Sequence, residues 1–504
     1  MQLSIDNNIK KPLYRQIADQ IETLIRKGDL PSGYILPPER KLAEVLSVNR
    51  TTVLNAYRSL KADGLVISKV GQGTMVDYTD ASPMKIKKEL MPLYLDHLYA
   101  TNGRYKMSKF EERLLKYTSD KSLISFAVGI LNRNDYPFGE NHLIKLSETY
   151  GEKLLEHTPF RGIDELIKEL INYMKAYNVN THSTEMLITS GSQQGISLVA
   201  DIFINPGDVV IVEDPTYFLG KQVFEMKGAK VIGVPMETDG MDMNFLEQIL
   251  KTTTVKLIYT MPNQHNPTNF NTSTEKKVRL LQLAYEYQAV ILEDGAYNDL
   301  AFDGNKPITL KSMDYNDQVI YLGTFSKVYS IGIRLGWLIA SSEIIERLAY
   351  IKHLRDIHTS SISQWLIYDL LARGVIQQGI RDIARINKEK LNQFIHCFDK
   401  LQMDQLGITY EIPSGSIYLW MKLPDTIDTE ELLQIAMKEG VVFVPGQLFS
   451  VGSKEGHNIR INFVYVADTM VEEGLKRLKT AIIKALEMKE GEQATLSLSG
   501  FATL

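Results

Sequence analysis

Apolar side chains recur at helical spacing in three series within residues 1–78. The first series ends before Gly28, and Pro31 follows; both residue types commonly mark the end of a helix. The members of the first series are Leu13, Ile17, Ile21, Leu24 and Ile25, those of the second are Leu42, Ala43 and Leu46, and those of the third are Val53, Ala56, Tyr57 and Leu60. The second and third series lie so close together that they predict a helix-turn-helix whose second helix begins near Asn49.

Two β-rich runs follow the third series, in the stretch LVISKVGQGTMVDY. They are joined around Gly71 and Gly73, which predicts a hairpin. Three helices followed by a hairpin occur both in DNA-binding domains and in domains that never touch DNA. The wider stretch LPPERKLAEVLSVNRTTVLNAYRSLKADGLVISKVGQGTMV closely resembles the winged helix-turn-helix of the GntR family of regulators, and this resemblance favours duplex DNA as a partner.

The resemblance implies that the second helix of the motif enters a major groove with its N-terminal residues toward the bases and phosphates. The residues at that end are Asn49, Arg50, Thr51 and Thr52. Arg50 has a fork of donors suited to guanine or phosphate, and the threonine hydroxyls suit phosphate oxygens. Arg40 resembles a backbone contact of the family, and Gly71 and Gly73 would let the hairpin approach the minor groove. Leu54 stands where the family often has a further arginine, so the operator of a relative does not transfer to this chain.

Charge and composition narrow the class of protein. The 504-residue chain has a net charge of −5, yet residues 1–80 hold two more basic than acidic side chains. A mildly positive terminal module on an acidic body is compatible with DNA contact through that module alone. The sequence has no run of eighteen apolar residues and no secretory start, so we expect a cytoplasmic protein without membrane contact. One cysteine, Cys397, and no Cys/His cluster give no indication of an intrachain disulfide or a metal site.

The rest of the chain divides by pattern. Residues 79–121 are polar and lack sustained periodicity, which predicts a linker. From 122 onward, short β-rich runs such as DVVIVEDPTY and QVIYLGTFSK alternate with helical segments, which predicts an α/β domain with a mostly parallel sheet flanked by helices. We therefore expect an α+β winged helix-turn-helix over 1–78 and a larger domain over 122–490. Its main part would end near 375, a smaller α+β part would begin near 376, and 491–504 would form a flexible tail.

Polar residues follow several of the predicted strands, at the edge of the sheet where α/β proteins bind ligands. In chain order they are Gly191, Ser192 and Gln193 at a helix start, Asn266 in NPT, Asp294 and Tyr297 after AVILE, Lys327 in TFSK, and Arg334. The helix start suits a phosphate because its N–H groups are unpaired. Singly, a strand-end lysine is usually a surface charge, and an Asp or an Asn-Pro-Thr there is usually a turn. Their joint occurrence in this order indicates a binding site.

This set resembles the site of the fold-type I aminotransferases, and its combination with the N-terminal motif resembles the MocR subfamily of GntR regulators. The resemblance implies pyridoxal 5'-phosphate (PLP), which requires a lysine amine, a carboxylate at its ring nitrogen and a cage for its phosphate. Lys327 would bind the cofactor covalently and later move a proton, and Asp294 would pair with the ring nitrogen. Tyr297 and Asn266 would hydrogen-bond the ring hydroxyl, and Tyr217, in DPTY, would stack on the ring. The residues that would hold the phosphate are Ser192, Gln193, Thr324, Ser326 and Arg334.

Arg460, in NIRINF, matches the arginine that clamps the carboxylate of an incoming amino acid with two parallel hydrogen bonds. A structural ion pair is the plain alternative for Arg460, as core packing is for Tyr217.

The segment LLEHTPFRGIDELIKEL departs from the Tyr-Gly-Asp-Pro-like stretch of relatives, which leaves its part in the site open. The resemblance also implies a homodimer with sites completed across the interface.

Three functions fit these motifs. The first is a DNA-binding regulator whose PLP domain senses an amino acid, an amine or a vitamin B6 form. The second is a working aminotransferase that carries a DNA-binding module, and the third is a regulator whose PLP domain only holds subunits together. The intact set of Lys327, Asp294 and Arg460 argues against the third, and the intact DNA motif argues against a plain metabolic enzyme. We therefore expect the regulator, with the catalytically competent aminotransferase as the alternative.

Overall fold

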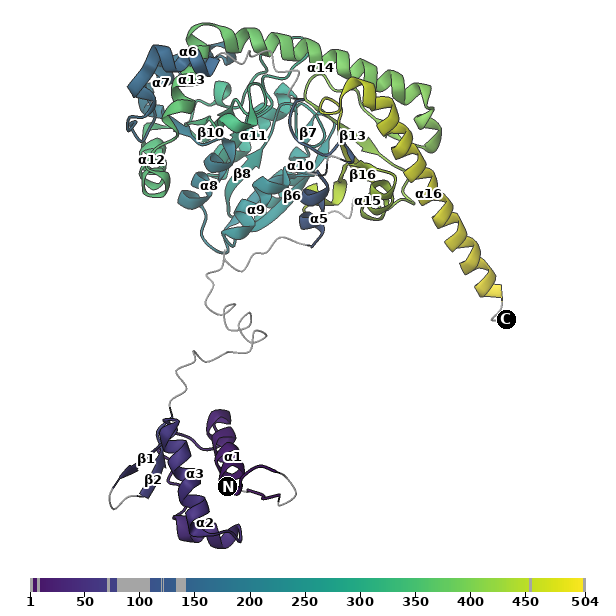
Figure 1. Cartoon of the computed structure of the whole chain (residues 1–504). Helices are drawn as coiled ribbons and strands as arrows, with labels where there is room; N and C mark the ends of the chain where they lie inside the picture. Colours follow the sequence, from purple (N-terminus) through teal and green to yellow (C-terminus); the bar gives the residue numbers. More distant parts are fainter. Residues whose placement is uncertain are drawn as a thin grey trace. The chain divides into compact units, whose positions relative to one another are not determined.

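The chain consists of two compact units, Met1–Tyr99 and Ala100–Leu504 (Figure 1). The computed structural model describes residues 3–6, 10–69, 73–78, 109–118, 120, 122–132, 142–452 and 456–501. Each unit has a hydrophobic core of its own.

Three helices and a hairpin make up the first unit. Their bounds are α1 Leu13–Lys27, α2 Glu39–Val45, α3 Arg50–Ala62, β1 Val66–Lys69 and β2 Gly73–Val76. Gly28 ends α1 in the left-handed conformation, with φ of 80°, which glycine adopts without strain. Apart from Leu13, the apolar series of the three helices packs together with Val66 and Val76, which lie opposite each other in the antiparallel hairpin. The predicted winged helix-turn-helix is confirmed.

An eight-stranded sheet forms the centre of the second unit, in the order β4-β11-β10-β9-β8-β5-β6-β7. The bounds are β4 Met186–Thr189, β5 Val209–Asp214, β6 Lys230–Glu237, β7 Gly240–Met241, β8 Val255–Thr260, β9 Val290–Asp294, β10 Val319–Thr324 and β11 Gly336–Ile339. The strands from β6 through β5, β8 and β9 to β10 are parallel neighbours. β4, β11 and β7 pair in the antiparallel sense, so the predicted mostly parallel sheet is confirmed with antiparallel edges.

Helices bury both faces of this sheet. Alternate residues of β5 face different cores: Val210 and Val212 belong to one, Val209 and Ile211 to the other. The second core includes apolar residues of α10 and α11, whereas the first includes residues of α8, α12 and α13. The helices of this main part are α6 His142–Tyr150, α7 Asp164–Met174, α8 Ser192–Phe203, α9 Phe218–Met226, α10 Met243–Thr252, α11 Thr274–Glu286, α12 Ser342–Asp356 and α13 Ser361–Ala372. Strands buried on both faces explain the continuous apolar runs of the sequence.

A four-stranded sheet, β12-β13-β16-β15, forms the smaller part of the unit. The elements are α14 Val375–Lys400, β12 Thr409–Tyr410, β13 Tyr418–Lys422, α15 Thr429–Lys438, β14 Val441–Val442, β15 Val444–Pro445, β16 Asn458–Asn462 and α16 Asp468–Phe501. β3, Ile124–Ser125, pairs in parallel with β14. The short strand β3 therefore lies with the smaller, C-terminal part of the unit.

Two segments differ from the sequence-based expectation. Helix α5, Lys109–Thr118, lies inside the predicted linker, and its Leu114 is buried in the core of the second unit. Leu114 and Tyr117, three residues apart, both face that core, a periodicity too short to stand out from the sequence. The predicted tail from 491 continues as part of α16 to Phe501, since its first residues are mostly good helix formers.

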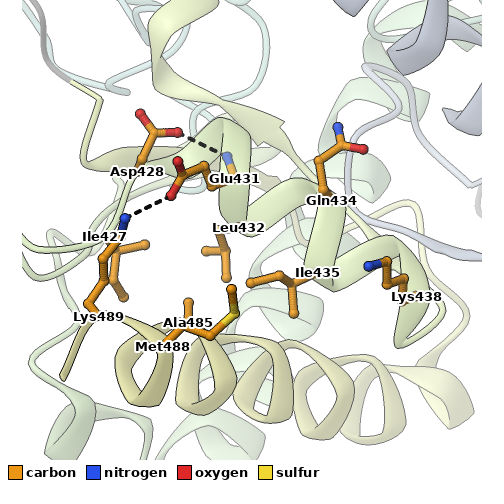
Figure 2. A pocket seen from close by; sticks show the side chains of 10 residues that line it. All are labelled: Ile427, Asp428, Glu431, Leu432, Gln434, Ile435, Lys438, Ala485, Met488 and Lys489. Atoms are coloured by element: carbon orange, nitrogen blue, oxygen red, sulfur yellow. Dashed lines mark hydrogen bonds and ion pairs between the residues drawn. The ribbon is translucent and has the colours of Figure 1, made fainter. Parts of the chain in front are cut away.

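A cleft of about 300 Å³ lies between α15 and α16 (Figure 2). The side chains of Leu432, Ile435 and Met488 face one another across it, and Lys489 forms an ion pair with Glu431 at 3.1 Å on its rim. The residues that line this cleft are distinct from those of the predicted cofactor site.

Candidate cofactor site and DNA-binding surface

Three neighbouring parallel strands bring predicted cofactor residues to one edge of the main sheet. β8, β9 and β10 are adjacent, so their carboxyl ends lie at the same edge. Asn266 follows β8, Asp294 ends β9, and Lys327 follows β10. Segments far apart in the sequence thus contribute to the edge where sheets of this kind bind ligands.

Asp294 is a buried carboxyl with two internal donors. Tyr259 Oη donates to its Oδ2 at 2.9 Å, and the backbone N–H of Ala296 donates to its Oδ1 at 3.1 Å. Burial raises the pKa of Asp294 to about 6, although both donors and the positive charge of Lys327 oppose the shift. At neutral pH the group is therefore mostly a buried anion, which a positively charged ring nitrogen would neutralise.

Lys327 points toward the residues predicted to hold the cofactor ring. Its Nζ donates to the backbone oxygen of Gly129 at 2.9 Å and lies 5.4 Å from the ring centre of Tyr297. Gly129 belongs to the segment that follows β3, so residues N-terminal to the main sheet also line the site.

Arg460 is joined to the same residues by hydrogen bonds. Its Nη1 donates to Asn266 Oδ1 at 2.9 Å, and Asn266 Nδ2 donates to Tyr297 Oη at 3.3 Å. Arg460 is 5% exposed, its Nη2 donates to the oxygen of Ala127 at 3.4 Å, and its Nε has no hydrogen-bond partner in the described part of the chain. Among the described residues, no carboxylate lies within ion-pair distance of Arg460, which leaves a buried cation to be neutralised.

The start of α8 lies beside Arg334. Gly191 precedes this helix, and no side chain caps the N–H groups of the first turn, where Ser192 and Gln193 lie. Arg334 Nη2 donates to the oxygen of Ser190 at 3.2 Å, and a Cβ on Gly191 would lie only 2.7 Å from that nitrogen. Uncapped N–H groups beside a guanidinium form a cradle suited to a phosphate, and glycine keeps it open.

Thr324 and Ser326 contribute hydroxyl groups at the end of β10, beside β11. Their oxygens are 3.0 Å apart, and Thr324 Oγ1 donates to the backbone oxygen of Leu335 at 2.9 Å. Leu335 is the neighbour of Arg334, so these hydroxyls and the guanidinium come from adjoining segments.

Tyr217 precedes α9 and contacts the phosphate cradle. Its Oη donates to Gln193 Oε1 at 3.3 Å, while Gln193 Nε2 donates to the oxygen of Leu219. Burial raises the pKa of the Tyr217 phenol above its ordinary value, which keeps it neutral. The structure thus brings Tyr217 and Gln193 together. This contact is required if the Tyr217 ring is to stack on the cofactor ring next to the phosphate site.

The donor set fits PLP. A buried carboxyl (Asp294) suits the ring nitrogen, a lysine amine lies at the same strand edge, and a cradle held open by Gly191 suits the phosphate.

Sequence inspection misses several residues of the site. Tyr418 Oη lies 3.2 Å from Tyr297 Oη, and Gly129 and Tyr259 contact Lys327 and Asp294. None of the three stands in a motif, and each meets a partner distant in sequence, so the chain offers no local signal for them.

A buried pair, Glu213 and His265, adjoins Asn266 and was also missed. Glu213 accepts from Thr260 Oγ1 at 2.6 Å and from the N–H of Met261 at 3.0 Å, and lies 3.1 Å from His265 Nε2. These contacts fix the backbone that leads from β8 to Asn266. The sequence signal for the pair is the histidine of HNPT, next to Asn266.

Four of the predicted DNA-contacting residues, Asn49, Arg50, Thr51 and Thr52, lie at the start of α3. The Asn49 side chain accepts from the N–H of Thr51 at 3.0 Å and from Thr51 Oγ1 at 2.7 Å, which caps the helix. Arg50 and Arg40 are exposed and Thr52 is half-buried. Gly73 begins β2 with φ of 90°, and Gly71 lies outside the described residues.

None of the helices in the described part of the chain is both long and apolar enough to cross a membrane. In the same residues, His, Cys, Asp and Glu side chains form no group suited to hold a metal ion.

Known proteins resemble both units. Residues 128–478 match the class I and II aminotransferases, and residues 13–76 match the bacterial regulatory proteins of the gntR family. The uncharacterized HTH-type transcriptional regulator YdfD of Bacillus subtilis is 30% identical over 476 residues, which cover 93% of this chain and 96% of that protein. Aromatic-amino-acid aminotransferase 1 of Thermococcus litoralis is 32% identical over 417 residues, covering 81% and 99%.

One of the similar solved structures contains a bound ligand. LysN, the alpha-aminoadipate aminotransferase of Thermus thermophilus, complexed with N-(5'-phosphopyridoxyl)-L-leucine, has a TM-score of 0.71 at 28% identity and covers 78% of this chain and 99% of its own.

Fold and site together define the class: a winged helix-turn-helix joined to a fold-type I aminotransferase-like unit whose cofactor is PLP. The chain belongs to the GntR family of bacterial regulatory proteins as a MocR-type member, and its larger unit belongs to the class I and II aminotransferase family.

Proposed function

We propose that the chain is a PLP-dependent, DNA-binding transcription regulator whose aminotransferase-type unit senses an amino acid, an amine or a vitamin B6 form. The observation that carries this proposal is Arg460, a buried cation that has no carboxylate partner among the described residues and is hydrogen-bonded to Asn266. Arginine presents two parallel donors that match a carboxylate, so Arg460 is the clamp for an amino-acid ligand. The exposed Arg50 at the start of α3 supports the second half of the function, the reading of duplex DNA.

In this proposal the residues of the site divide the binding of the cofactor and the transfer of a proton among them. Bound PLP supplies an electron sink for the chemistry of amines. Lys327 holds it covalently and moves a proton at its own Nζ, while Asp294 keeps the ring nitrogen charged. Tyr297 and Asn266 hydrogen-bond the ring hydroxyl, and Tyr217 covers one face of the ring. Ser192, Gln193, Thr324, Ser326 and Arg334 hold the phosphate.

The attachment of the cofactor is tested on the purified protein. We expect a yellow protein in which borohydride fixes the cofactor to the peptide that contains Lys327. Lys327→Ala should lose the covalent product and retain weaker binding through the phosphate cradle, whereas Lys422→Ala, an exposed lysine, should behave as wild type. A reduced product on any other lysine contradicts the assignment.

Sensing is tested by DNA affinity. Operator duplexes selected from a random library are titrated with the cofactor-loaded protein, with and without a panel of amino acids and amines. We expect at least one compound that perturbs the visible spectrum to change operator affinity. If every spectrally active compound leaves operator affinity unchanged, the regulator proposal fails.

A working aminotransferase is the second candidate. It is supported by the complete set of Lys327, Asp294 and Arg460 in one network and by the 32% identity to the Thermococcus litoralis enzyme. Steady-state turnover with pairs of amino acids and 2-oxo acids separates the two functions. Rapid multiple turnovers favour the enzyme, and slow or single half-reactions favour the sensor.

We further propose a cytoplasmic homodimer. Exposed apolar side chains gather at the end of α12, where Leu354 is 66% exposed and Phe160 packs on His353 with ring centres 5.5 Å apart. A surface of this kind suits a subunit interface. Sedimentation velocity of the cofactor-loaded protein should give twice the mass of the 57.2 kDa chain.

A further inference from the structure

Tyr418 closes a ring of four contacts inside the site. Arg460 Nη1 donates to Asn266 Oδ1 at 2.9 Å, and Asn266 Nδ2 donates to Tyr297 Oη at 3.3 Å. Tyr297 Oη lies 3.2 Å from Tyr418 Oη, and the ring centre of Tyr418 lies 4.1 Å from the guanidinium carbon of Arg460. All four side chains are at most 5% exposed. This closed set of contacts joins Arg460, the proposed carboxylate clamp, to Asn266 and Tyr297, the two residues proposed to hydrogen-bond the ring hydroxyl of PLP.

The chemistry of arginine fixes the direction of the hydrogen bonds in this ring. A guanidinium only donates, so Asn266 must present its carbonyl oxygen to Arg460 and its amide nitrogen to Tyr297. Tyr297 Oη accepts that bond and keeps its own O–H for a further acceptor. Tyr418 Oη is within reach as this acceptor.

Tyr418 also holds Arg460 through its aromatic face. The guanidinium contacts two rings, with its carbon 4.1 Å from the centre of Tyr418 and 4.9 Å from the centre of Phe449. Antiparallel pairing of β13 with β16 places Trp420 opposite Arg460, and Trp420 in turn packs on Phe449 with ring centres 5.7 Å apart. Loss of the Tyr418 ring would remove one wall of this cation site.

The backbone makes room for the phenol. A Cβ on Gly129 would lie 2.8 Å from Tyr418 Oη and 4.0 Å from Lys327 Nζ, so a side chain there would displace the hydroxyl. The hydroxyl is thus enclosed between Gly129 and Tyr297.

Charge distinguishes the two phenols. Burial opposes ionisation of Tyr418, but the cations Arg460 and Lys327 outweigh it, and the pKa of Tyr418 lies below its ordinary value. Burial raises the pKa of Tyr297 well above its ordinary value. Both directions agree with the arrangement set by Asn266, in which Tyr297 accepts from the amide and donates its own O–H to Tyr418.

We infer that Tyr418 is a positioning residue that couples the carboxylate clamp Arg460 to Tyr297. When a ligand's carboxylate neutralises the charge of Arg460, the hydrogen bond donated by Tyr297 changes. The inference rests on the proposed PLP and carboxylate roles of these residues. Tyr418 thereby links the recognition of a ligand's carboxylate to the electronic state of the cofactor ring.

The first test needs no cofactor. Ultraviolet absorbance of the cofactor-free protein is followed from pH 7 to 12, and we expect one tyrosine to ionise ahead of the others in wild type. This early step should be absent in Tyr418→Phe and present in Tyr177→Phe, which removes an equally buried hydroxyl outside the site. Superimposable curves for wild type and Tyr418→Phe overturn the inference, whether or not the PLP roles hold.

The second test uses the cofactor-loaded protein. Tyr418→Phe keeps the ring over Arg460 and loses the hydroxyl, so the pH midpoint of the visible absorbance should shift by about half a unit or more. In an Arg460→Gln background the same substitution should shift the midpoint much less, because the coupling is already broken. A shift that is equal in both backgrounds, or an unchanged midpoint, overturns the inference. A purely structural role would lower thermal stability in Tyr418→Phe and leave the midpoint unmoved.

If the protein binds no PLP, the second test fails at loading and the proposed function fails with it. The first test then still decides whether Arg460 and Lys327 favour the ionised Tyr418.

Discussion

At the residue scale, burial sets the charges of the site. The carboxyl of Asp294 is 2% exposed and has its pKa raised to about 6 by burial, in spite of donors from Tyr259 and Ala296. The same sheet edge holds Lys327, whose charge lowers that pKa. The site thus contains a buried anion whose energy depends on a cationic partner.

Asp294→Asn should flatten the pH dependence of stability in the cofactor-free protein. The folded-state pKa of about 6 lies above the ordinary value of 3.8, so the folded state holds this proton more tightly. The resulting stability is present below pH 4 and is lost as pH rises through about 6, an effect on the order of 3 kcal/mol.

Urea unfolding at several pH values between 4 and 7.5 measures this effect. Burial raises the pKa of Glu293 to about 7, and this residue is present in both proteins, so it adds the same slope to both plots of stability against pH. The difference between the two plots therefore isolates the contribution of Asp294. Equal pH profiles for the two proteins would show that Asp294 is not the group responsible.

The sequence predicts which residues come together in much of the candidate site because these residues follow strands at regular places. Asn266, Asp294 and Lys327 are recognisable by their motifs, and parallel pairing brings those strand ends together. Tyr418 and Gly129 enter through contacts that no motif records, since Tyr418 lies 121 residues from Tyr297 and Gly129 lies 198 residues from Lys327. Only the three-dimensional structure shows such pairs.

At the element scale, the start of α3 is the place where helix capping and the proposed DNA contact meet. Asn49 accepts from the backbone and hydroxyl of Thr51, and the exposed Arg50 is the first residue of the helix. The apolar face of α3 was readable from sequence because it is regular. Helix α5 cannot be predicted in this way, because it has a short apolar face and lies in a polar segment.

Asn49→Ala should destabilise the first unit by about 1 kcal/mol, because the N–H of Thr51 loses its cap. Asn49→Asp should retain the stability, since aspartate caps equally well. Thermal unfolding of an isolated 1–78 fragment, which has its own core, measures both variants. A fully stable alanine variant would mean that the cap contributes nothing.

Arg50→Ala should weaken operator binding by about 1–3 kcal/mol if the guanidinium grips a base edge, with relaxed specificity at one position. Lys61→Ala, in the last turn of the same helix, is the matched control and should lose much less. Affinities at several salt concentrations separate a lost base contact from a lost phosphate contact, which alone would lower the salt slope by about one. Identical specificity profiles for Arg50→Ala and wild type would refute the base contact.

At the scale of the whole molecule, one chain joins a DNA-reading unit to a ligand site. A ligand shifts an equilibrium between two arrangements only by its different affinity for each, and couplings of about 1–3 kcal/mol are usual. Such a coupling changes operator occupancy several-fold.

Arg460→Ala should abolish this coupling and leave cofactor loading and basal operator affinity nearly intact. The reason is that Arg460 contacts Asn266 and the proposed carboxylate position, whereas Lys327 and the phosphate cradle remain. Operator affinity of wild type and variant, with and without a spectrally active amino acid, decides the matter. A variant that still responds to the amino acid would place the clamp elsewhere.

The pairing of β3 with β14 also has a consequence for synthesis on the ribosome. Ile124 is made early, but its partner Val441 emerges roughly 300 residues later, about 15 s to 1 min at ordinary rates of translation. The hydrophobic core of the winged helix-turn-helix is made entirely of side chains between Leu3 and Tyr78, so this unit can fold in the meantime. Every newly made chain therefore passes through an interval in which the DNA-binding unit can be folded while the aminotransferase-type unit is incomplete. If that unit senses a ligand as proposed, a chain that stalls before Val441 would carry DNA-binding capacity that no ligand controls.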